Sequence, residues 1–331
     1  MMKLRECSCN DEGGRGRGGI DGCPHSTAVG ALLAEAAPQP AHRQRGSGSR
    51  QPQRLQLRMR QTENLPLSGV LVRNNVHVSG NPAGRPMVFA HGFGCSQEMW
   101  RAVVPEFEAD YRIVLFDHVG AGDSDLAQYD YGKYDSLHGY ADDIVEILDE
   151  LDLQDVVFVG HSVSAMIGIL AETRSPQRFG ALALVCPSPR YINDGGYAGG
   201  FDQGEISGLL DALDANYLGW SATMAPVFMG SADRPHLGQE LAVSFCKADP
   251  DIASHFAHVT FLSDNRRDLA LVSTPTLIVQ SANDVIAPLP VGQYVHQEIS
   301  GSSLVVLPTS GHCPNLSAPD LLAAAIRDYL A

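Results

Sequence analysis

Short apolar runs recur along the chain after residue 65 and alternate with longer segments whose apolar residues follow a helical period. The short runs are typical of buried strands, and an apolar residue at every third or fourth position is typical of a helix packed on a sheet. Strands are expected near 69–78, 87–90, 112–116, 155–159, 181–186, 276–281 and 303–307. Helices are expected at about 97–108, 136–151, 163–174, 290–299 and 318–330. This alternation predicts an α/β fold with a mostly parallel, doubly wound sheet.

The interval between Cys186 and Thr276 interrupts the alternation. It contains about 90 residues, whereas a crossover between parallel strands needs only about a dozen. Its pattern is helical and rich in aromatic residues, which predicts a helical cap at about 190–265. Periodicity alone leaves open whether these aromatic side chains form the core of the cap or the roof of a pocket.

The first 65 residues have no sustained apolar pattern, and they include a Gly/Arg-rich segment at 13–19. A segment of this composition cannot bury enough apolar surface to fold, so residues 1–65 are predicted to be a disordered extension and residues 66–331 the folded domain. Met59 lies shortly before that domain. We therefore consider the hypothesis that translation starts at Met59 and that the upstream residues reflect a wrongly assigned start.

The segment 160–164, with the sequence GHSVS, lies between a predicted strand and a predicted helix. A serine at this position stands on a sharp turn that exposes its Oγ at the carboxyl end of the strand. A serine hydroxyl needs a base to take its proton, and an acid and a histidine follow two later strands. These two partners make a turn without chemistry the weaker interpretation. We predict a catalytic triad in which Asp284 orients His312 and His312 activates Ser162.

The predicted strand at 87–90 ends in the loop 91–94, with the sequence HGFG. In this arrangement such a loop supplies a second hydrogen-bond donor to the oxyanion, and the predicted donors are the backbone N–H groups of Phe93 and Val163. Each donor of this kind contributes about 3 kcal/mol of transition-state stabilisation. His161 is expected to pack in the core, because the residue before an elbow serine normally points away from the reaction.

At these motifs the chain resembles the α/β-hydrolase superfamily, and within it the branch of the bacterial stress regulator RsbQ and the plant karrikin and strigolactone receptors. The resemblance spans roughly 72–330 and rests also on the segments 116–125, 187–191, 199–201 and 216–220. Ser164 replaces the final Gly of the usual elbow, as in members of this branch. The resemblance implies an α/β-hydrolase fold with a helical cap inserted after the sixth strand. It also favours as pocket walls Phe93, Phe201, Trp220 and Met224.

An aromatic roof over a serine nucleophile implies a small, largely apolar substrate held by shape. The predicted function is a serine hydrolase that cleaves a small ester or lactone through an acyl-enzyme on Ser162. The resemblance leaves a second function open, that of an RsbQ-like small-molecule sensor that hydrolyses slowly and acts through a PAS-domain phosphatase type of partner. The N-terminal tail offers no motif in support of a plant-type hormone receptor. An inactive scaffold is disfavoured because the triad and the 91–94 loop are complete.

Charge is distributed unevenly along the chain. Residues 1–65 hold 10 Lys or Arg against 6 Asp or Glu, a net of +4, while the remainder holds 13 against 32, a net of −19. The acidic domain disfavours nucleic acid and an anionic membrane surface as partners. No run of about 18 apolar residues is present, so no membrane-spanning segment is expected.

The spacing of cysteine and histidine residues indicates neither a disulfide framework nor a metal site. The cysteines of the domain show no disulfide framework, which suits a reducing compartment and predicts a cytoplasmic protein. No cofactor and no metal site are expected, because the spacing of Cys7, Cys9, Cys23 and His25 matches no usual zinc motif and the histidines of the domain lack ligand-type neighbours.

Overall fold

The computed structural model describes residues 69–331, and the predictions made for residues 1–65, including the start at Met59, lie outside the described residues. The described chain forms a sheet with the strand order β1-β3-β2-β4-β5-β6-β7. Strand β1 runs antiparallel to β3, and the other neighbours are parallel. The strands are β1 (His77–Gly80), β2 (Arg85–Ala90), β3 (Tyr111–Leu115), β4 (Val156–His161), β5 (Phe179–Val185), β6 (Thr276–Asn283) and β7 (Ser303–Ser310). The predicted mostly parallel, doubly wound sheet is confirmed.

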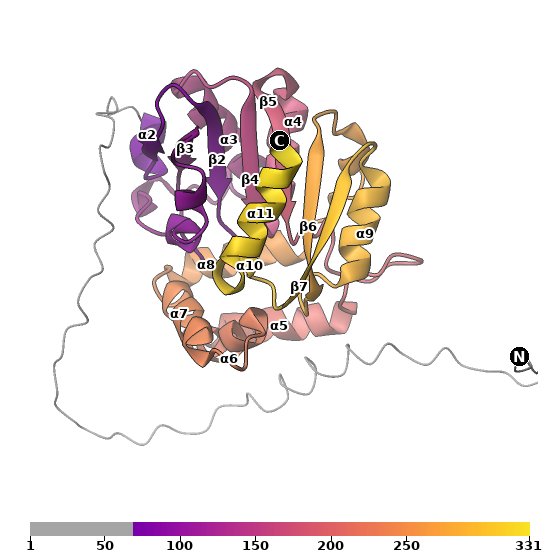
Figure 1. The fold of residues 1–331 in the computed structure, drawn as a ribbon. Helices are drawn as coiled ribbons and strands as arrows, with labels where there is room; N and C mark the ends of the chain where they lie inside the picture. Colours follow the sequence, from indigo (N-terminus) through magenta and orange to yellow (C-terminus); the bar gives the residue numbers. More distant parts are fainter. Residues whose placement is uncertain (1–68) are drawn as a thin grey trace, which may run out of the picture.

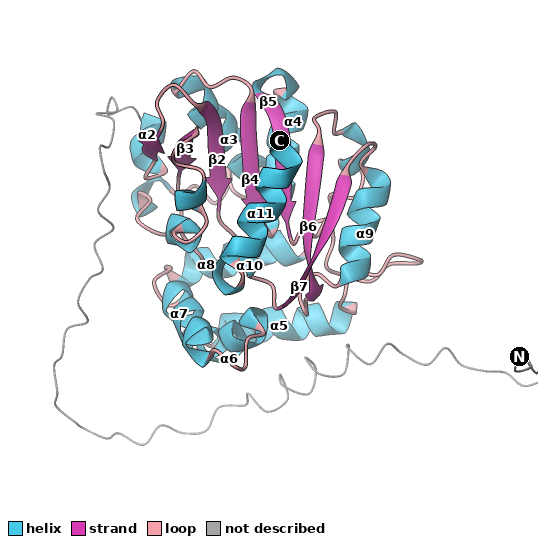
Figure 2. Ribbon diagram, in the orientation of Figure 1, coloured by secondary structure: helices cyan, strands magenta, loops and turns pink. Residues whose placement is uncertain are grey.

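Helices cover both faces of this sheet (Figure 1; Figure 2). In the view of Figure 1, α11 crosses in front of the strands, and α3 and α4 lie behind them. Strand β4 is buried along its whole length, which explains why its sequence is a continuous apolar run rather than an alternating one. The helices that flank the sheet are α2 (Gly69–Arg73), α3 (Leu137–Glu150), α4 (Val163–Arg174), α9 (Leu289–Glu298), α10 (Pro314–Ser317) and α11 (Pro319–Leu330). Short 3₁₀ turns occupy Gln97–Trp100, Val104–Glu106, Leu126–Gln128, Pro176–Arg178 and Leu269–Leu271.

Four further helices occupy the interval in which the cap is expected, and they lie beyond the carboxyl ends of the parallel strands (Figure 1). They are α5 (Gln203–Ala215), α6 (Tyr217–Met229), α7 (Pro235–Phe245) and α8 (Pro250–Phe261). The insertion follows β5, the fifth strand of the described sheet, and not a sixth strand as expected. Five of the strands expected from the sequence also precede this interval, so the count of six rests on the family resemblance alone.

The segment at 69–78 was expected to be a strand throughout, and its first half is helix α2 instead. Its apolar β-branched residues favour a strand, but contacts to residues far along the chain stabilise a helix instead. Arg73 forms an ion pair with the buried Asp143 of α3 at 2.8 Å, and the Asn74 side chain donates to the Asp117 carbonyl oxygen at 3.2 Å. The chain then turns through Asn75, which has a φ of 45°, and enters β1.

The helix expected at 97–108 is also different in the structure, where two separate 3₁₀ turns replace it. Pro105 lies in the second turn, and a proline has no N–H to continue a helical hydrogen-bond ladder. The helices expected at 136–151, 163–174, 290–299 and 318–330 are confirmed to within a residue or two at each end.

Glu172 anchors the place where the chain re-enters the sheet after the cap. Its buried Oε1 accepts hydrogen bonds from the backbone N–H and the hydroxyl of both Ser273 and Thr274, at 2.9–3.2 Å. Four donors to this one oxygen offset part of the cost of burying the carboxylate. The end of α4 is thereby tied to the start of β6. Within residues 69–331, no helix is both long enough and apolar enough to cross a membrane.

The close packing of α4 on β4 predicts the effect of adding a methyl group at Gly168. A Cβ at this position would overlap the ring of the buried Phe158, so Gly168→Ala should lower the free energy of unfolding by about 1–3 kcal/mol. Gly208 on α5 is the matched control, because a Cβ there meets no atom within 4 Å. Gly208→Ala should leave stability unchanged or raise it by up to about 1 kcal/mol. Urea unfolding of both variants measures the difference, and equal effects would contradict the packing argument.

Candidate active site

Ser162 stands on the turn between β4 and α4 in a backbone conformation that few residues adopt. Its φ is 58° and its ψ is −123°, and its N–H donates to the Val185 carbonyl oxygen of the neighbouring strand at 2.8 Å. A non-glycine residue held in this region is strained, and such strain persists only where the surroundings impose it. Gly160 allows the turn to pack this tightly, because a Cβ at this position would lie only 2.5 Å from the Ser164 carbonyl oxygen.

The three residues predicted as a triad lie in one hydrogen-bonded chain. The His312 Nε2 atom lies 2.7 Å from the Ser162 Oγ, and its Nδ1 atom lies 2.7 Å from the Asp284 Oδ2. The other carboxylate oxygen of Asp284 accepts the N–H groups of Ile286 and Ala287 at 2.8 and 3.1 Å. With Nδ1–H donating to the carboxylate, Nε2 is left to accept the serine proton. The arrangement can therefore turn a serine hydroxyl into a nucleophile.

The cap helps to hold the histidine of this chain. The backbone N–H of His312 donates to the Phe228 carbonyl oxygen of α6 at 2.7 Å. Gly311, with a φ of 91°, lies so close to the end of α6 that a Cβ would overlap the Met229 carbonyl group. The position of His312 thus depends on α6 as well as on the sheet.

His161 supports the loop that carries His312 through a hydrogen bond. Its Nε2–H donates to the His312 carbonyl oxygen at 2.7 Å, and burial, together with the charge that His312 can carry, lowers the pKa of His161 to about 3. A neutral imidazole at this position acts as a fixed donor. It takes no part in the chain from Ser162 to Asp284, in line with the expected packing role.

The two predicted oxyanion donors belong to two different segments next to Ser162, the start of α4 and the loop after β2. Val163 begins α4, where the first N–H groups of a helix have no partner within the helix. Phe93 follows Gly92, which approaches the His161 ring so closely that a Cβ would lie 2.6 Å from its Nδ1 atom. In the described part of the chain, neither the Phe93 N–H nor the Val163 N–H makes a hydrogen bond. Both remain available to an oxygen atom on a substrate.

A small apolar cavity of about 20 Å³, room for about one water molecule, adjoins Ser162 and His312. Its walls come from the loop after β2, the segments that follow β4, β5, β6 and β7, and the cap helices α6, α7 and α8. The lining residues besides Ser162 and His312 are Phe93, Cys95, His161, Tyr191, Phe228, Leu241, Phe245, Thr260, Phe261, Ile286 and Cys313. The periodicity of the sequence could not tell which aromatic residues line this cavity and which form the core of the cap.

Of the four residues expected to wall the pocket, Phe93 lines this cavity and Phe201, Trp220 and Met224 do not. Trp220 lies one layer behind, because its ring packs edge-on against Phe93 at 6.2 Å and stacks on Phe245 at 6.0 Å. Phe201 and Met224 are buried. A direct role of these three residues in binding stays a prediction.

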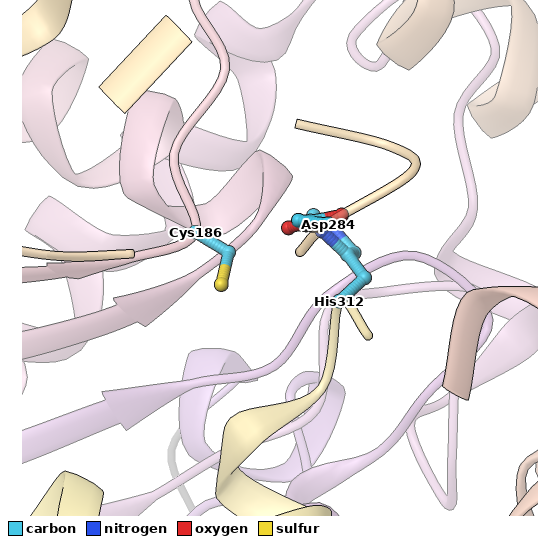
Figure 3. A group of neighbouring side chains, drawn as sticks. All are labelled: Cys186, Asp284 and His312. Atoms are coloured by element: carbon cyan, nitrogen blue, oxygen red, sulfur yellow. Dashed lines mark hydrogen bonds and ion pairs between the residues drawn. The ribbon is translucent and has the colours of Figure 1, made fainter. Parts of the chain in front are cut away.

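Cys186 is a neighbour of the triad that the sequence-based reasoning did not single out. Figure 3 shows it beside Asp284 and His312, and the three ligand-type atoms lie within 4.8 Å of one another. Such a trio could hold a metal ion, but burial next to the Asp284 carboxylate raises the pKa of the Cys186 thiol. A metal ion would also have to displace the proton that lies between the His312 Nδ1 and the Asp284 Oδ2. In the described chain, Cys95, Cys186, Cys246 and Cys313 all carry free thiols.

A parallel α/β sheet with a Ser-His-Asp chain at its carboxyl edge and a helical insertion above it defines the class of α/β hydrolases. The model of the Alpha/beta hydrolase family matches residues 87–325, and the chain belongs to this family. This agrees with the resemblance drawn from the sequence motifs.

Similar proteins include plant proteins named as esterases and receptors. The chain is 41% identical to strigolactone esterase D14 of Arabidopsis thaliana, over 79% of this chain and 97% of that protein. It is 40% identical to karrikin insensitive 2 receptor CA of Petunia hybrida, over 78% and 95% of the two chains. Among solved structures, olei00960, a hydrolase from Oleispira antarctica, superposes with a TM-score of 0.77 at 40% identity, over 79% of this chain and 96% of that one.

The neutral state of buried His161 predicts a loss of stability in acid. Below about pH 6.5 the unfolded chain binds a proton at this residue, and the folded chain does not until about pH 3. The free energy of unfolding should therefore fall by about 1.4 kcal/mol per pH unit as pH drops through that interval. In His161→Gln, the loss between pH 7 and pH 5 should be smaller than in the wild type by about 2 kcal/mol. Urea unfolding at both pH values measures it, with the exposed His236→Gln as the control; parallel curves for all three proteins would contradict the prediction.

Proposed function

We propose that the protein is a serine hydrolase that cleaves a small, largely apolar ester or lactone through an acyl-enzyme on Ser162. The observation that carries the proposal is the hydrogen-bonded chain from Ser162 through His312 to Asp284, with a spacing of 2.7 Å at both links. The apolar cavity beside Ser162 supports a substrate with few polar groups. The name of the Arabidopsis relative, an esterase, is consistent with this chemistry.

In the first half of the reaction, the Ser162 Oγ attacks the carbonyl carbon while His312 takes its proton. Asp284 stabilises the imidazolium that forms, and the N–H groups of Phe93 and Val163 hold the developing oxyanion. The intermediate collapses as the bond to the leaving alkoxide breaks, and His312 passes its proton to that oxygen. An ester of Ser162 remains.

In the second half, a water molecule attacks the acyl carbon and His312 takes its proton. The bond to the Ser162 Oγ then breaks, His312 returns the proton to the serine, and the carboxylic acid leaves. A lactone follows the same steps, except that its leaving oxygen stays on the acyl group. The cavity of about 20 Å³ is far smaller than the several hundred Å³ of a usual ligand site, so lining side chains must move when a substrate enters.

A small-molecule sensor with slow hydrolysis is the second candidate function. The hydrogen bond between the His312 N–H and the Phe228 carbonyl oxygen of the cap favours it, because a change at the triad would reach α6 directly. The Petunia relative is named as a receptor. Under this proposal the cap presents an altered surface to a protein partner, for which the sequence resemblance suggests a PAS-domain phosphatase.

Ser162→Ala should lower the turnover of a short p-nitrophenyl ester by at least about a thousandfold and leave the binding of a non-reactive ligand nearly unchanged. The reason is that the variant loses the nucleophile but keeps the cavity. Steady-state rates and the mass of the acid-quenched enzyme measure the effect. The control is Ser221→Ala, which removes another buried serine hydroxyl outside the cavity lining and should keep the wild-type rate.

The same traces separate the two candidate functions. Sustained turnover that depends on Ser162 supports the hydrolase. A burst of about one equivalent followed by slow release, with a lasting adduct on Ser162, supports the sensor. Wild-type rates in Ser162→Ala would exclude the triad from the reaction.

A further inference from the structure

Ser164 joins the nucleophile elbow to the oxyanion loop through its side chain. The residue is fully buried near the start of α4, and its hydroxyl donates to the His91 carbonyl oxygen. The His118 Nε2 atom lies 2.7 Å from the same hydroxyl oxygen. A carbonyl oxygen can only accept, so the serine proton points to His91 and His118 must donate its Nε2–H to Ser164.

The protonation states of the two histidines fit this direction of hydrogen bonding. Burial lowers the pKa of His118 well below its ordinary value, so the ring is neutral, and its Nδ1 atom has no hydrogen-bond partner in the described chain. A proton on Nε2 is therefore the arrangement that leaves no buried N–H unpaired. The backbone N–H of His118 donates to the His91 Nε2 atom at 3.0 Å, which requires the proton of His91 to be on Nδ1.

This proton on His91 determines how the next peptide group is turned. The His91 Nδ1–H donates to the Gly92 carbonyl oxygen at 2.9 Å, and the Cys95 N–H donates to the same oxygen at 3.2 Å. The Gly92 carbonyl and the Phe93 N–H belong to one trans peptide group and point in opposite directions. Holding the carbonyl toward His91 and Cys95 therefore keeps the Phe93 N–H turned away from them and free of internal partners.

We propose that Ser164, held by His118, is a positioning residue that keeps the 91–94 loop in the orientation that presents the Phe93 N–H to the oxyanion. The proposal rests on the proposed hydrolase function, because the oxyanion is that of the acyl-transfer reaction. A glycine at position 164 completes the usual elbow but has no hydroxyl to reach the loop. The serine thus gives this chain a direct bond between the helix that starts at the nucleophile and the loop that carries the second donor.

Two variants that lack the hydroxyl test the proposal. Ser164→Ala and Ser164→Gly should each lower kcat for a short p-nitrophenyl ester by about tenfold or more and change KM by less than about twofold, because a misoriented donor weakens binding of the transition state more than of the substrate. The glycine variant carries the residue of the usual elbow and guards against a folding defect specific to alanine. Thr276→Val is the matched control, since it removes a buried hydroxyl-to-carbonyl hydrogen bond of 2.8 Å, to Thr274, at the opposite end of β6.

Amide hydrogen exchange of the peptide that covers 91–95 supplies a readout independent of turnover. In both Ser164 variants this peptide should exchange faster than in the wild type, while in Thr276→Val it should not. A fall in kcat no larger than that of Thr276→Val, or unchanged exchange in this peptide, would overturn the positioning role. If Ser162 proves not to be the nucleophile, the exchange result still decides whether Ser164 holds the loop, so the two failures are distinguishable.

Discussion

The left-handed backbone of Ser162, with its φ of 58°, is the constraint on which the rest of the site depends. It lets the chain pass from a buried strand to a buried helix within one residue and places the hydroxyl at the junction, beside His312 and the cavity. The surrounding packing maintains it, since Gly160 admits the close approach of α4 and the Ser162 N–H is bound to β5. A looser junction would relax this strain and turn the Oγ away from His312.

The parallel sheet explains how residues far apart in sequence reach this hydroxyl. Strands β4, β6 and β7 end at the same edge, so the residues that follow them meet there. Ser162 and His312 are 150 residues apart in the sequence, yet the Ser162 Oγ lies 2.7 Å from the His312 Nε2 atom. The insertion after β5 covers that edge, and its hydrogen bond to the His312 N–H makes the cap part of the support of the site rather than only its roof.

Buried neutral histidines form the second layer of the site. Burial lowers the pKa of His91, His118 and His161, so all three act as fixed donors and acceptors. Neutral rings suit this place, because a charged imidazole would be costly to bury and would alter the field around the reacting atoms. Protons on defined ring nitrogens then hold the backbone of the two loops that meet at Ser162.

Local sequence patterns were enough to predict the parallel sheet, the elbow and the order Ser162, Asp284, His312. Strand runs and the residues that follow them are local features, and the topology of a parallel sheet dictates where those residues meet. Local patterns did not determine helix α2, which depends on the pairing of Arg73 with Asp143, 70 residues away. The sequence pattern also could not predict which residues line the cavity or that Cys186 lies beside Asp284. These features depend on contacts between segments far apart in the chain, since periodicity reports that a side chain is buried and not which distant side chain it meets.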